Sequence, residues 1–531
     1  MPKLATKGGA MRAHIVGGGF GGLAAAAYLI RNADVPGPDI TIYEAEARPG
    51  GGFFLGGDAR SGYNLPGSVF DSEFRCTFDL MADVPSNRVP TGSVKDDFFT
   101  FNNQNMFNDL AHIIDRNGQI QHSPRYGLSL HHGFDLVKLT LMSEAETEGR
   151  QIQDFVPADF FQTEFWLLWS TIMGSLPQHG ATEFRRYIKR ALDLFPDLEN
   201  MRHIMRTPIC QYQFFIEPLV TWLQARGVKF QTGTFVRDIG LAPAPDRITV
   251  ERLTCEQGGA ASDVAVGADD IVLLTTGSQA AAMSAGSMTD PAPKLSSNAT
   301  WSLWQKLAAS RPGFGDPSVF FGDAAIADSR WITFTVTDTG NAFVDTLSAM
   351  TKSEPGRGGL VTLKDSNWVI SLSIFHQPEI LGQPDGTKVW WGYGLYPDKI
   401  GAFVKKPMTD CTGAEILEEV LRQLRFDKQF DAIMGTSKCI PCNMPFVNNI
   451  WMPRTRTNRP PPVPEGSTNL GLIGQYVEVE QDVAFTIEYS ARTAWEAIHT
   501  LLKRGPEPPD VYQGDRDPKA LLGALKTFIG Q

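Results

Sequence analysis

The 531-residue sequence predicts an α/β fold, in which a discontinuous, Rossmann-like parallel sheet is interrupted by α+β insertions. Three observations predict it. A short apolar strand at residues 12–16 leads through a glycine-rich turn into a helix of small residues at 23–30. A second apolar strand follows at residues 39–43. Two later apolar segments, 269–278 and 469–475, end in small-residue turns, as strands do at the ligand-binding edge of such a sheet.

The turn at residues 17–22 matches the GxGxxG pattern on Gly17, Gly19 and Gly22. Gly17 permits the tight turn, Gly19 lets the backbone approach a pyrophosphate, and Gly22 lets the helix pack closely on the strand. The start of the helix directs free amides and a positive dipole end at the phosphates. We therefore expect these three glycines and Phe20 to bind a dinucleotide.

The residues after the second strand favour FAD over NAD. Glu44 ends the strand, at a position where an acid accepts both ribose hydroxyls and disfavours a 2′-phosphate. Arg48, Gly50 and Gly51 follow, and a basic residue before a glycine pair is typical of two-dinucleotide-binding-domain flavoproteins. The sequence contains no second GxGxxG, so we expect no separate NAD(P)H domain.

The later strands complete the cofactor domain. The first ends at Gly277 and Ser278, and the second ends at Gln475 before a helix at 483–503, so we expect these residues to contact FAD. The expected division is 11–118, 219–290 and 464–503 for the FAD-binding domain, 119–218 for a largely helical insertion, 291–463 for the substrate-binding domain, and 504–531 for a C-terminal helical tail.

Two segments of the first insertion have helical spacing. Residues 155–169 are rich in aromatic side chains, which indicates either a core helix or an apolar wall for a long hydrocarbon ligand. Residues 179–190 place four cations near Tyr187, which would favour a hydrogen-bonded or ionised phenol. The alternative is a helix with a solvated basic face.

The second insertion contains two further aromatic-rich segments, 301–331 and 367–396, which are predicted as strands and turns. Cys439 and Cys442 form a lone CxxC without a second ligand pair, which favours packing over a zinc or redox role, and no metal site is expected. The proline-rich residues 459–466 predict a stiff, extended connector.

The composition is that of a globular, acidic, cytoplasmic protein. Hydrophobic residues are 42% and the net charge is -11, which excludes a largely disordered chain and a broad basic face for nucleic acid. Six cysteines in so long a chain fit reduced thiols rather than a disulfide scaffold. The N-terminal residues lack the apolar core of a secretory signal. Residues 14–30 have about the length of a membrane span, but their glycines fit a strand, turn and helix better.

A series of motifs occurs in order along the chain: GLAAAAYLIR at 22–31, WSLW at 301–304, HQP at 376–378, WGYGLYPDK at 391–399, CTGAEI at 411–416, GQYVE at 474–478, FTIEYS at 485–490, VYQG at 511–514 and DPK at 517–519. Through these motifs the sequence resembles the oleate hydratase family, also called myosin-cross-reactive antigen proteins, over nearly its whole length. The match at 474–478 adds Glu478 to the expected FAD-binding residues.

The resemblance implies a hydro-lyase that requires FAD but moves no net electrons. It would add water across an isolated cis double bond of a free unsaturated fatty acid, in the manner of oleate to 10-hydroxystearate. An unactivated alkene needs a proton on one face and a held water on the other, in a dry pocket. The family's proton-donating tyrosine matches Tyr187. The resemblance matches the family's carboxylate-binding residues to Gln211 and Asn448. Polar side chains suffice there, since charge-assisted hydrogen bonds to a carboxylate are strong when buried.

One loop departs from the family pattern. The family's cofactor loop reads Arg-Gly-Gly-Arg-Glu, and its Glu is assigned to the water or to flavin positioning. The aligned residues 65–76 are shorter here and place Val69 or Phe70 at that point. Asp71 or Glu73 is the expected substitute, unless polar groups alone hold the water.

Dimeric members of the family carry a longer leader before the first strand, so we expect a monomer. A helix at 519–529 is expected to pack at the terminus, with transient membrane contact as the alternative. Two other functions stay open. One is a flavin-dependent isomerase or oxidoreductase acting on an apolar lipid, and the other is a non-catalytic lipid- or flavin-binding protein.

Overall fold

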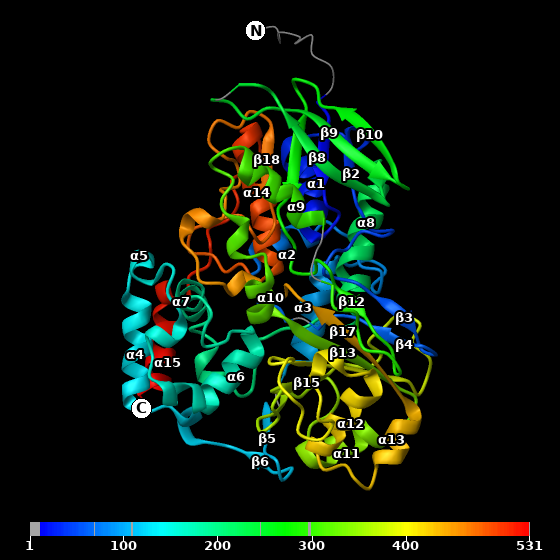
Figure 1. Ribbon diagram of the computed structural model, residues 1–531, viewed down its shortest axis with the longest axis vertical. Helices are drawn as coiled ribbons and strands as arrows, with labels where there is room; N and C mark the ends of the chain where they lie inside the picture. The colour runs from blue at the N-terminus through cyan, green and yellow to red at the C-terminus, as the bar shows by residue number, and fades with distance from the viewer. Residues whose placement is uncertain (1–10, 68, 108–109, 245, 296–298, 530–531) are drawn as a thin grey trace.

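A five-stranded parallel sheet lies in the upper part of the molecule in Figure 1. In this computed structural model, which describes residues 11–529 except 68, 108–109, 245 and 296–298, the strand order is β18-β11-β1-β2-β7. These strands are Leu470–Ile473, Ile271–Thr275, Ala13–Val16, Ile40–Tyr43 and Lys229–Gln231, respectively. Strands from the beginning, middle and end of the chain thus pair in one sheet, which confirms the Rossmann-like α/β fold class. The domain boundaries drawn from the sequence stay a prediction.

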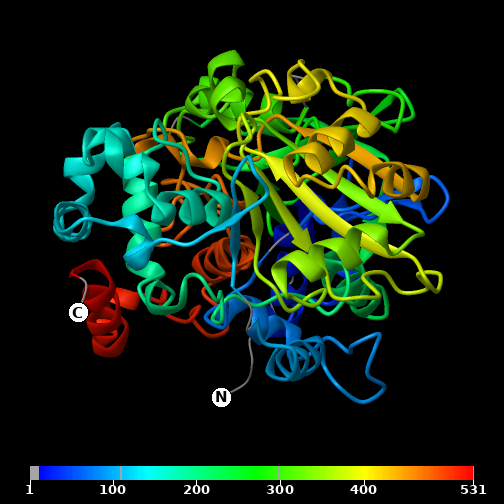
Figure 2. The same ribbon diagram turned by 90° about the horizontal axis from the view of Figure 1, so that it is seen from below.

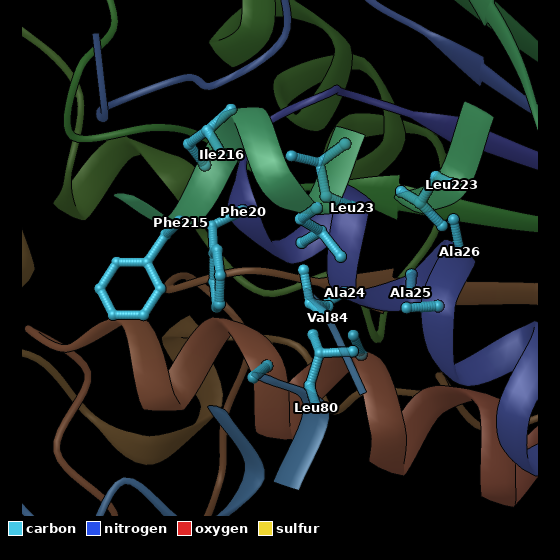
Figure 3. Close-up of a cluster of buried hydrophobic side chains, with 14 of the residues drawn as sticks. Phe20, Leu23, Ala24, Ala25, Ala26, Leu80, Val84, Phe215, Ile216 and Leu223 are labelled. Carbon is cyan, nitrogen blue, oxygen red and sulfur yellow. The ribbon is translucent and has the colours of Figure 1, made fainter. Parts of the chain in front are cut away.

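Helices α1 (Phe20–Ala33) and α14 (Ile487–Leu502) pack together on one face of this sheet, with α8 (Glu217–Gln224) and α2 (Arg75–Met81) beside them. Residues 23–29 of α1 are fully buried, and the alanines among them let neighbouring helices approach closely. Figure 3 shows the α1 side chains gathered between Ile216 and Leu223 on one side and Leu80 on the other. Close packing therefore fixes α1, and with it the turn that precedes it.

A three-stranded antiparallel sheet covers the other face, in the order β10-β9-β8. Its strands are Ala260–Ala265, Val250–Gln257 and Thr234–Leu241, respectively. Val236 and Leu253 from this sheet share a buried core with Val272 and Leu472 of the parallel sheet. Strands β1, β2, β11 and β18 are thus buried on both faces, which explains their largely apolar sequences. The edge strand β7 is short and mostly exposed.

The lower part of the molecule in Figure 1 is built on an eight-stranded mixed sheet, ordered β12-β17-β13-β16-β15-β14-β5-β6. Its strands are, in that order, Ser284–Ala285, Ser437–Met444, Trp331–Asp338, Lys388–Gly394, Ile370–Ile374, Val361–Leu363, His112–Ile114 and Ile120–Gln121. Helices α11 (Ala342–Thr351), α12 (Gly413–Gln423) and α13 (Phe430–Thr436) share its core, and the hairpin β3 (Gly56–Asp58) and β4 (Gly62–Asn64) packs on β13 and β17.

A helical lobe lies at one side of both sheets (Figures 1 and 2). It contains α4 (Leu130–Leu141), α5 (Glu144–Thr147), α6 (Glu164–Met173), α7 (Ala181–Arg190) and the C-terminal α15 (Pro518–Ile529). Helix α3 (Val94–Gln104) lies outside this lobe and packs against α2. Ala520 and Ala524 of α15 are buried in the core of this lobe, and α15 contacts α4. The tail helix therefore packs at the terminus.

The prediction of strands and turns for residues 301–331 is wrong. The segment forms α9 (Ala299–Ser310) and α10 (Asp323–Ser329) before β13 begins. Trp301, Trp304 and Leu307 are buried at helical spacing, and this period outweighs the strand preference of aromatic side chains. For residues 367–396 the prediction is confirmed by β15 and β16.

Cys439 and Cys442 lie in β17, where both thiols are fully buried, as expected for packing residues. Among the described residues, no helix combines the length and the apolar character needed to span a membrane.

Candidate functional site

The glycine-rich turn between β1 and α1 has no room for a side chain at Gly17 or Gly22. A Cβ atom on Gly22 would lie 1.9 Å from the carbonyl oxygen of Gly17, and Gly17 itself has a φ of +104°. The amide of Gly50 donates to the carbonyl of Gly18 at 2.9 Å, which closes the second glycine segment on the first. The turn is therefore an open backbone cradle at the N-terminus of α1, with the amides and dipole end that suit a pyrophosphate.

Glu44 binds this turn directly. Its carboxylate accepts hydrogen bonds from the amides of Gly18 at 2.7 Å and Glu46 at 2.8 Å. Burial raises the pKa of Glu44, and these two bonds act in the opposite direction. An ionised carboxylate has about four acceptor sites, so capacity for ribose hydroxyls is left. Arg48 lies at the surface, where its guanidinium donates to the carbonyl of Leu55 at 3.0 Å.

A cavity of about 380 Å³ adjoins the turn. The predicted FAD-binding residues that line it are Gly19, Phe20, Gly50, Gly51, Gly277, Ser278 and Gln475. The rest of the wall is largely apolar and comes from the end of α6, from α7 and from the mixed sheet, which contributes Trp331, Trp391 and Tyr393. The cavity thus lies where the parallel sheet, the mixed sheet and the helical lobe meet.

Tyr187 lies on α7 in the wall of this cavity and is 5% exposed. Its ring packs on Trp451, with the two ring centroids 4.7 Å apart. The hydroxyl has no hydrogen-bond partner of standard geometry among the described residues. Burial raises the pKa of Tyr187 well above its ordinary value, and the nearby charge of Glu183 raises it further. The phenol is therefore protonated at neutral pH.

The four cations of residues 179–190 favoured a hydrogen-bonded or an ionised phenol, and the raised pKa of Tyr187 excludes the ionised form. The cations do not ionise the phenol because carboxylates neutralise each of them. The ion pairs are Arg185 with Glu144, Arg186 with Glu144 and Glu478, Lys189 with Asp515, and Arg190 with Asp71 and Asp482.

Glu478 belongs to this buried ion cluster and is not among the described residues that line the cavity. Its carboxylate lies 2.7 Å from Arg186 and 2.9 Å from Arg454. The structure therefore does not bring Glu478 to the expected cofactor site, because two buried arginines hold its carboxylate. Arg454 also pairs with Glu183 at 2.7 Å, which joins the cluster to the helix turn that precedes Tyr187.

Charged side chains are few in the cavity wall. Among the described lining residues, the acidic and basic ones are Asp71, Arg190 and His203. The Asp71 carboxylate lies 3.7 Å from the Arg190 guanidinium and accepts a hydrogen bond from the amide of Glu73 at 2.8 Å. Arg190 follows Tyr187 by three positions on α7, so the phenol and the ion pair lie on the same side of the helix.

The shortened loop brings Asp71 to the cavity but not Glu73. The Glu73 carboxylate pairs with Arg75 at 2.7 Å, and Glu73 is not among the described lining residues. Val69 and Phe70 line the cavity at the point where the resemblance leads one to expect a glutamate. Phe70 is buried, and its amide donates to the carbonyl of Met205 at 2.9 Å.

The two expected carboxylate-binding residues are not among the described residues that line the cavity. Asn448 is fully buried, and its side-chain amide donates to the carbonyl of Gly174 at 2.6 Å. Gln211 is 3% exposed, with its side-chain oxygen unpartnered among the described residues. Their role in binding a substrate carboxylate stays a prediction.

The aromatic segment before α7 serves mainly as core. Trp169 of α6 stacks on Phe195 with centroids 5.9 Å apart and meets Phe184 edge-on at 5.5 Å. The last residues of the same helix, including Ile172 and Met173, line the cavity. The lining residues of this helix lie beyond 155–169, so the core interpretation holds for that segment and the structure does not place it as the wall of the cavity.

Sequence reasoning missed Arg190, His203 and Trp331 as lining residues. The helical period of α7 contained the signal for Arg190, since it falls on the same face as Tyr187. His203 and Trp331 come from a turn and from the start of a strand, and neither position carries a periodic signal.

Comparison with known proteins gives two kinds of result. The family model described as "MCRA family" matches residues 10–499. Oleate hydratase of Streptococcus pyogenes serotype M49 (strain NZ131) is 30% identical over 530 residues, which cover 97% of this chain and 89% of that protein. Linoleate hydratase of Lactiplantibacillus plantarum is 28% identical over 568 residues, which cover 98% of each.

Solved structures resemble this one in fold. Cyclohexylamine oxidase from Brevibacterium oxydans IH-35A superposes with a TM-score of 0.54 at 11% identity, over 93% of this chain and 99% of that chain. This likeness agrees with the Rossmann-like flavoprotein fold of the parallel sheet. Because the family model matches most of the sequence, the chain belongs to the MCRA family, which is the family that the sequence motifs indicated.

Proposed function

We propose that this protein is a fatty acid hydratase that binds FAD and adds water to an isolated cis double bond of a free unsaturated fatty acid. One observation carries the proposal: the protonated phenol of Tyr187 lies in the wall of a mostly apolar cavity that also adjoins the nucleotide turn. The hydro-lyase class follows from family membership and from two relatives that are hydratases.

The residues at the turn fit FAD. The glycine cradle leaves the amides at the start of α1 free for a pyrophosphate, and Glu44 lies at the end of β2, where a ribose would be held. Gly277 and Gln475 continue the wall from the turn into the cavity. Bound FAD would supply shape and electrostatics beside the double bond, without net electron transfer.

Tyr187 is proposed as the general acid. Burial and Glu183 keep the phenol protonated, and no hydrogen bond of standard geometry among the described residues competes for its hydroxyl. Its proton would move to one alkene carbon while the oxygen of a water molecule bonds to the other carbon. A separate group must then accept a proton from that water.

Asp71 is proposed as this base. Its carboxylate lines the cavity, and Arg190 and the amide of Glu73 hold it there. It would orient the water and accept its proton, which then returns to the Tyr187 oxygen. The cycle consumes one water and one alkene, forms one alcohol, and leaves the protein unchanged.

A flavin-dependent isomerase or oxidoreductase is the second candidate. The loop favours it, because Val69 and Phe70 line the cavity where the family pattern has a glutamate. This candidate predicts a shifted double bond or a bleached flavin, with no oxygen taken up from water.

Heavy-oxygen water distinguishes the two candidates. The protein is incubated with FAD and with oleate or linoleate in labelled water, and the extracted lipids are analysed by mass spectrometry. A hydratase gives a labelled hydroxy fatty acid and an unchanged flavin spectrum. If no unsaturated fatty acid yields a labelled hydroxy acid, the proposed function is wrong.

A further inference from the structure

The C-terminal segment 510–515 lies on the end of α7. The Lys189 side chain pairs with Asp515 at 2.7 Å. A Cβ atom on Gly514 would lie 2.8 Å from the carbonyl oxygens of both Lys189 and Arg190. The segment therefore reaches the backbone of α7 at the position of Arg190, the arginine in the cavity wall.

The ring of Tyr512 in this segment contacts two arginines. The centre of its ring is 5.7 Å from the guanidinium carbon of Arg190 and 5.6 Å from that of Arg75. Arg75 also pairs with Glu73 at 2.7 Å and donates to the carbonyl of Asp510 at 3.5 Å. Guanidinium groups over an aromatic ring at such distances are attracted by its π electrons.

Arg190 connects this contact to the cavity. Its guanidinium is 3.7 Å from Asp71 and 3.8 Å from Asp482, and it donates to the carbonyl of Glu73 at 3.4 Å. Each of these contacts is long for a charged hydrogen bond, which normally measures about 2.7–2.9 Å. The polar contacts alone therefore hold the group loosely, and packing on the rings of Tyr512 at 5.7 Å and Phe74 at 5.8 Å contributes to placing it.

We propose that Tyr512 is a positioning residue of the site, whose ring holds the Arg190 guanidinium beside Asp71 at the cavity wall. The C-terminal segment would then complete the site, although it lies far from Asp71 in the sequence. The inference rests on the proposed function, in which Asp71 accepts the proton from water. Tyr512 acts through Arg190 and is not among the described lining residues.

The test compares Tyr512→Ala with Tyr512→Phe. Loss of the ring should lower kcat about fivefold to tenfold. A cation–π attraction of about 1 kcal/mol corresponds to a factor of about five in rate. KM should change less than about twofold, because substrate contacts are unaffected. Tyr512→Phe should behave as wild type, because the ring is kept. A phenylalanine variant as slow as the alanine variant would overturn the inference.

Gln513→Ala is the matched control. The Gln513 side chain anchors the same segment by donating to Gln481 at 2.6 Å, and no contact with Arg190 is described for it. This variant should keep the wild-type kcat. If it loses as much activity as Tyr512→Ala, anchoring of the segment explains the effect and the positioning role is wrong.

A double-mutant cycle tests the contact without any assay of activity. Tyr512→Ala, Arg190→Met and the double variant are compared by urea unfolding of the full chain. Tyr512→Ala should shift the folding equilibrium less in the Arg190→Met background than in wild type. Additive shifts would overturn the inference. A protein that hydrates no fatty acid would instead contradict the proposed function. The cycle would still show whether Tyr512 and Arg190 interact.

Discussion

Replacing Glu183 with glutamine should strongly destabilise the protein, because this carboxylate neutralises two buried arginines. Glu183 is 2% exposed and accepts hydrogen bonds from Arg454 at 2.7 and 2.9 Å. Arg459 lies 3.2 Å from the same carboxylate oxygen, with a fully buried side chain. Removing one partner from a buried ion pair costs about 3–5 kcal/mol, because the remaining charge stays uncompensated.

The pKa of Glu183 leads to a similar magnitude. Burial acts to raise it, but Arg459 and Arg454 outweigh burial and lower the pKa from 4.5 to about 2. A difference of this size between the unfolded and folded chain corresponds to about 3 kcal/mol of stability at neutral pH. Because the folded pKa is the lower one, this stability is fully present above pH 4.5 and is lost as the pH falls toward 2.

The assay is urea unfolding of wild type and Glu183→Gln, followed by tryptophan fluorescence at neutral pH and at several acidic pH values. The difference in unfolding free energy should be about 3 kcal/mol at pH 7 and should shrink on acidification. Glu144→Gln is the control, because Glu144 also pairs with α7 but has a side chain that is 21% exposed. This substitution should lower the unfolding free energy by only about 1 kcal/mol. A loss below about 1 kcal/mol for Glu183→Gln would refute the reasoning, as would a difference independent of pH.

Four further substitutions, one of them a control, test the site. Tyr187→Phe should lower kcat roughly 10²- to 10⁴-fold in the labelled-water assay, as loss of a general acid does, and unchanged turnover would exclude it as the acid. Asp71→Asn should lower kcat without changing the flavin absorbance of the purified protein. Glu73→Gln alters a side chain outside the cavity wall and should leave kcat unchanged. Gly22→Ala should give protein without bound flavin, because the added methyl would lie 1.9 Å from a backbone oxygen of the turn; normal flavin content would contradict this.

The parallel sheet and the nucleotide turn could be predicted because their signals are local. Strands β1 and β11 are short, largely apolar runs. The turn needs glycine because Gly17 has a positive φ and the backbone leaves no room for a Cβ atom at Gly22. Pairing of β1 with β11 and of β11 with β18 follows from the rules of parallel sheets, although these strands are far apart in the chain. The fold class therefore needed no long-range information about side chains.

The helices at 301–331 were missed for a reason that is also physical. Aromatic residues favour strands when nothing else is known, but Trp301 and Trp304 are buried together at helical spacing against Tyr476, which comes from a distant segment. The roles of Gln211, Asn448 and Glu478 raise the same difficulty. Whether a buried polar side chain meets a ligand, a carbonyl or an arginine depends on segments that the sequence around it does not reveal.

The protonation of Tyr187 shows how far such long-range partners can reverse a local inference. The four cations around it in the sequence favour a hydrogen-bonded or ionised phenol. In the folded chain their charges are balanced by carboxylates from separate segments, among them Asp71, Asp482 and Asp515. Burial then dominates and keeps the proton on the phenol. Carboxylates from distant segments therefore leave α7 with a neutral acid in a mostly apolar cavity.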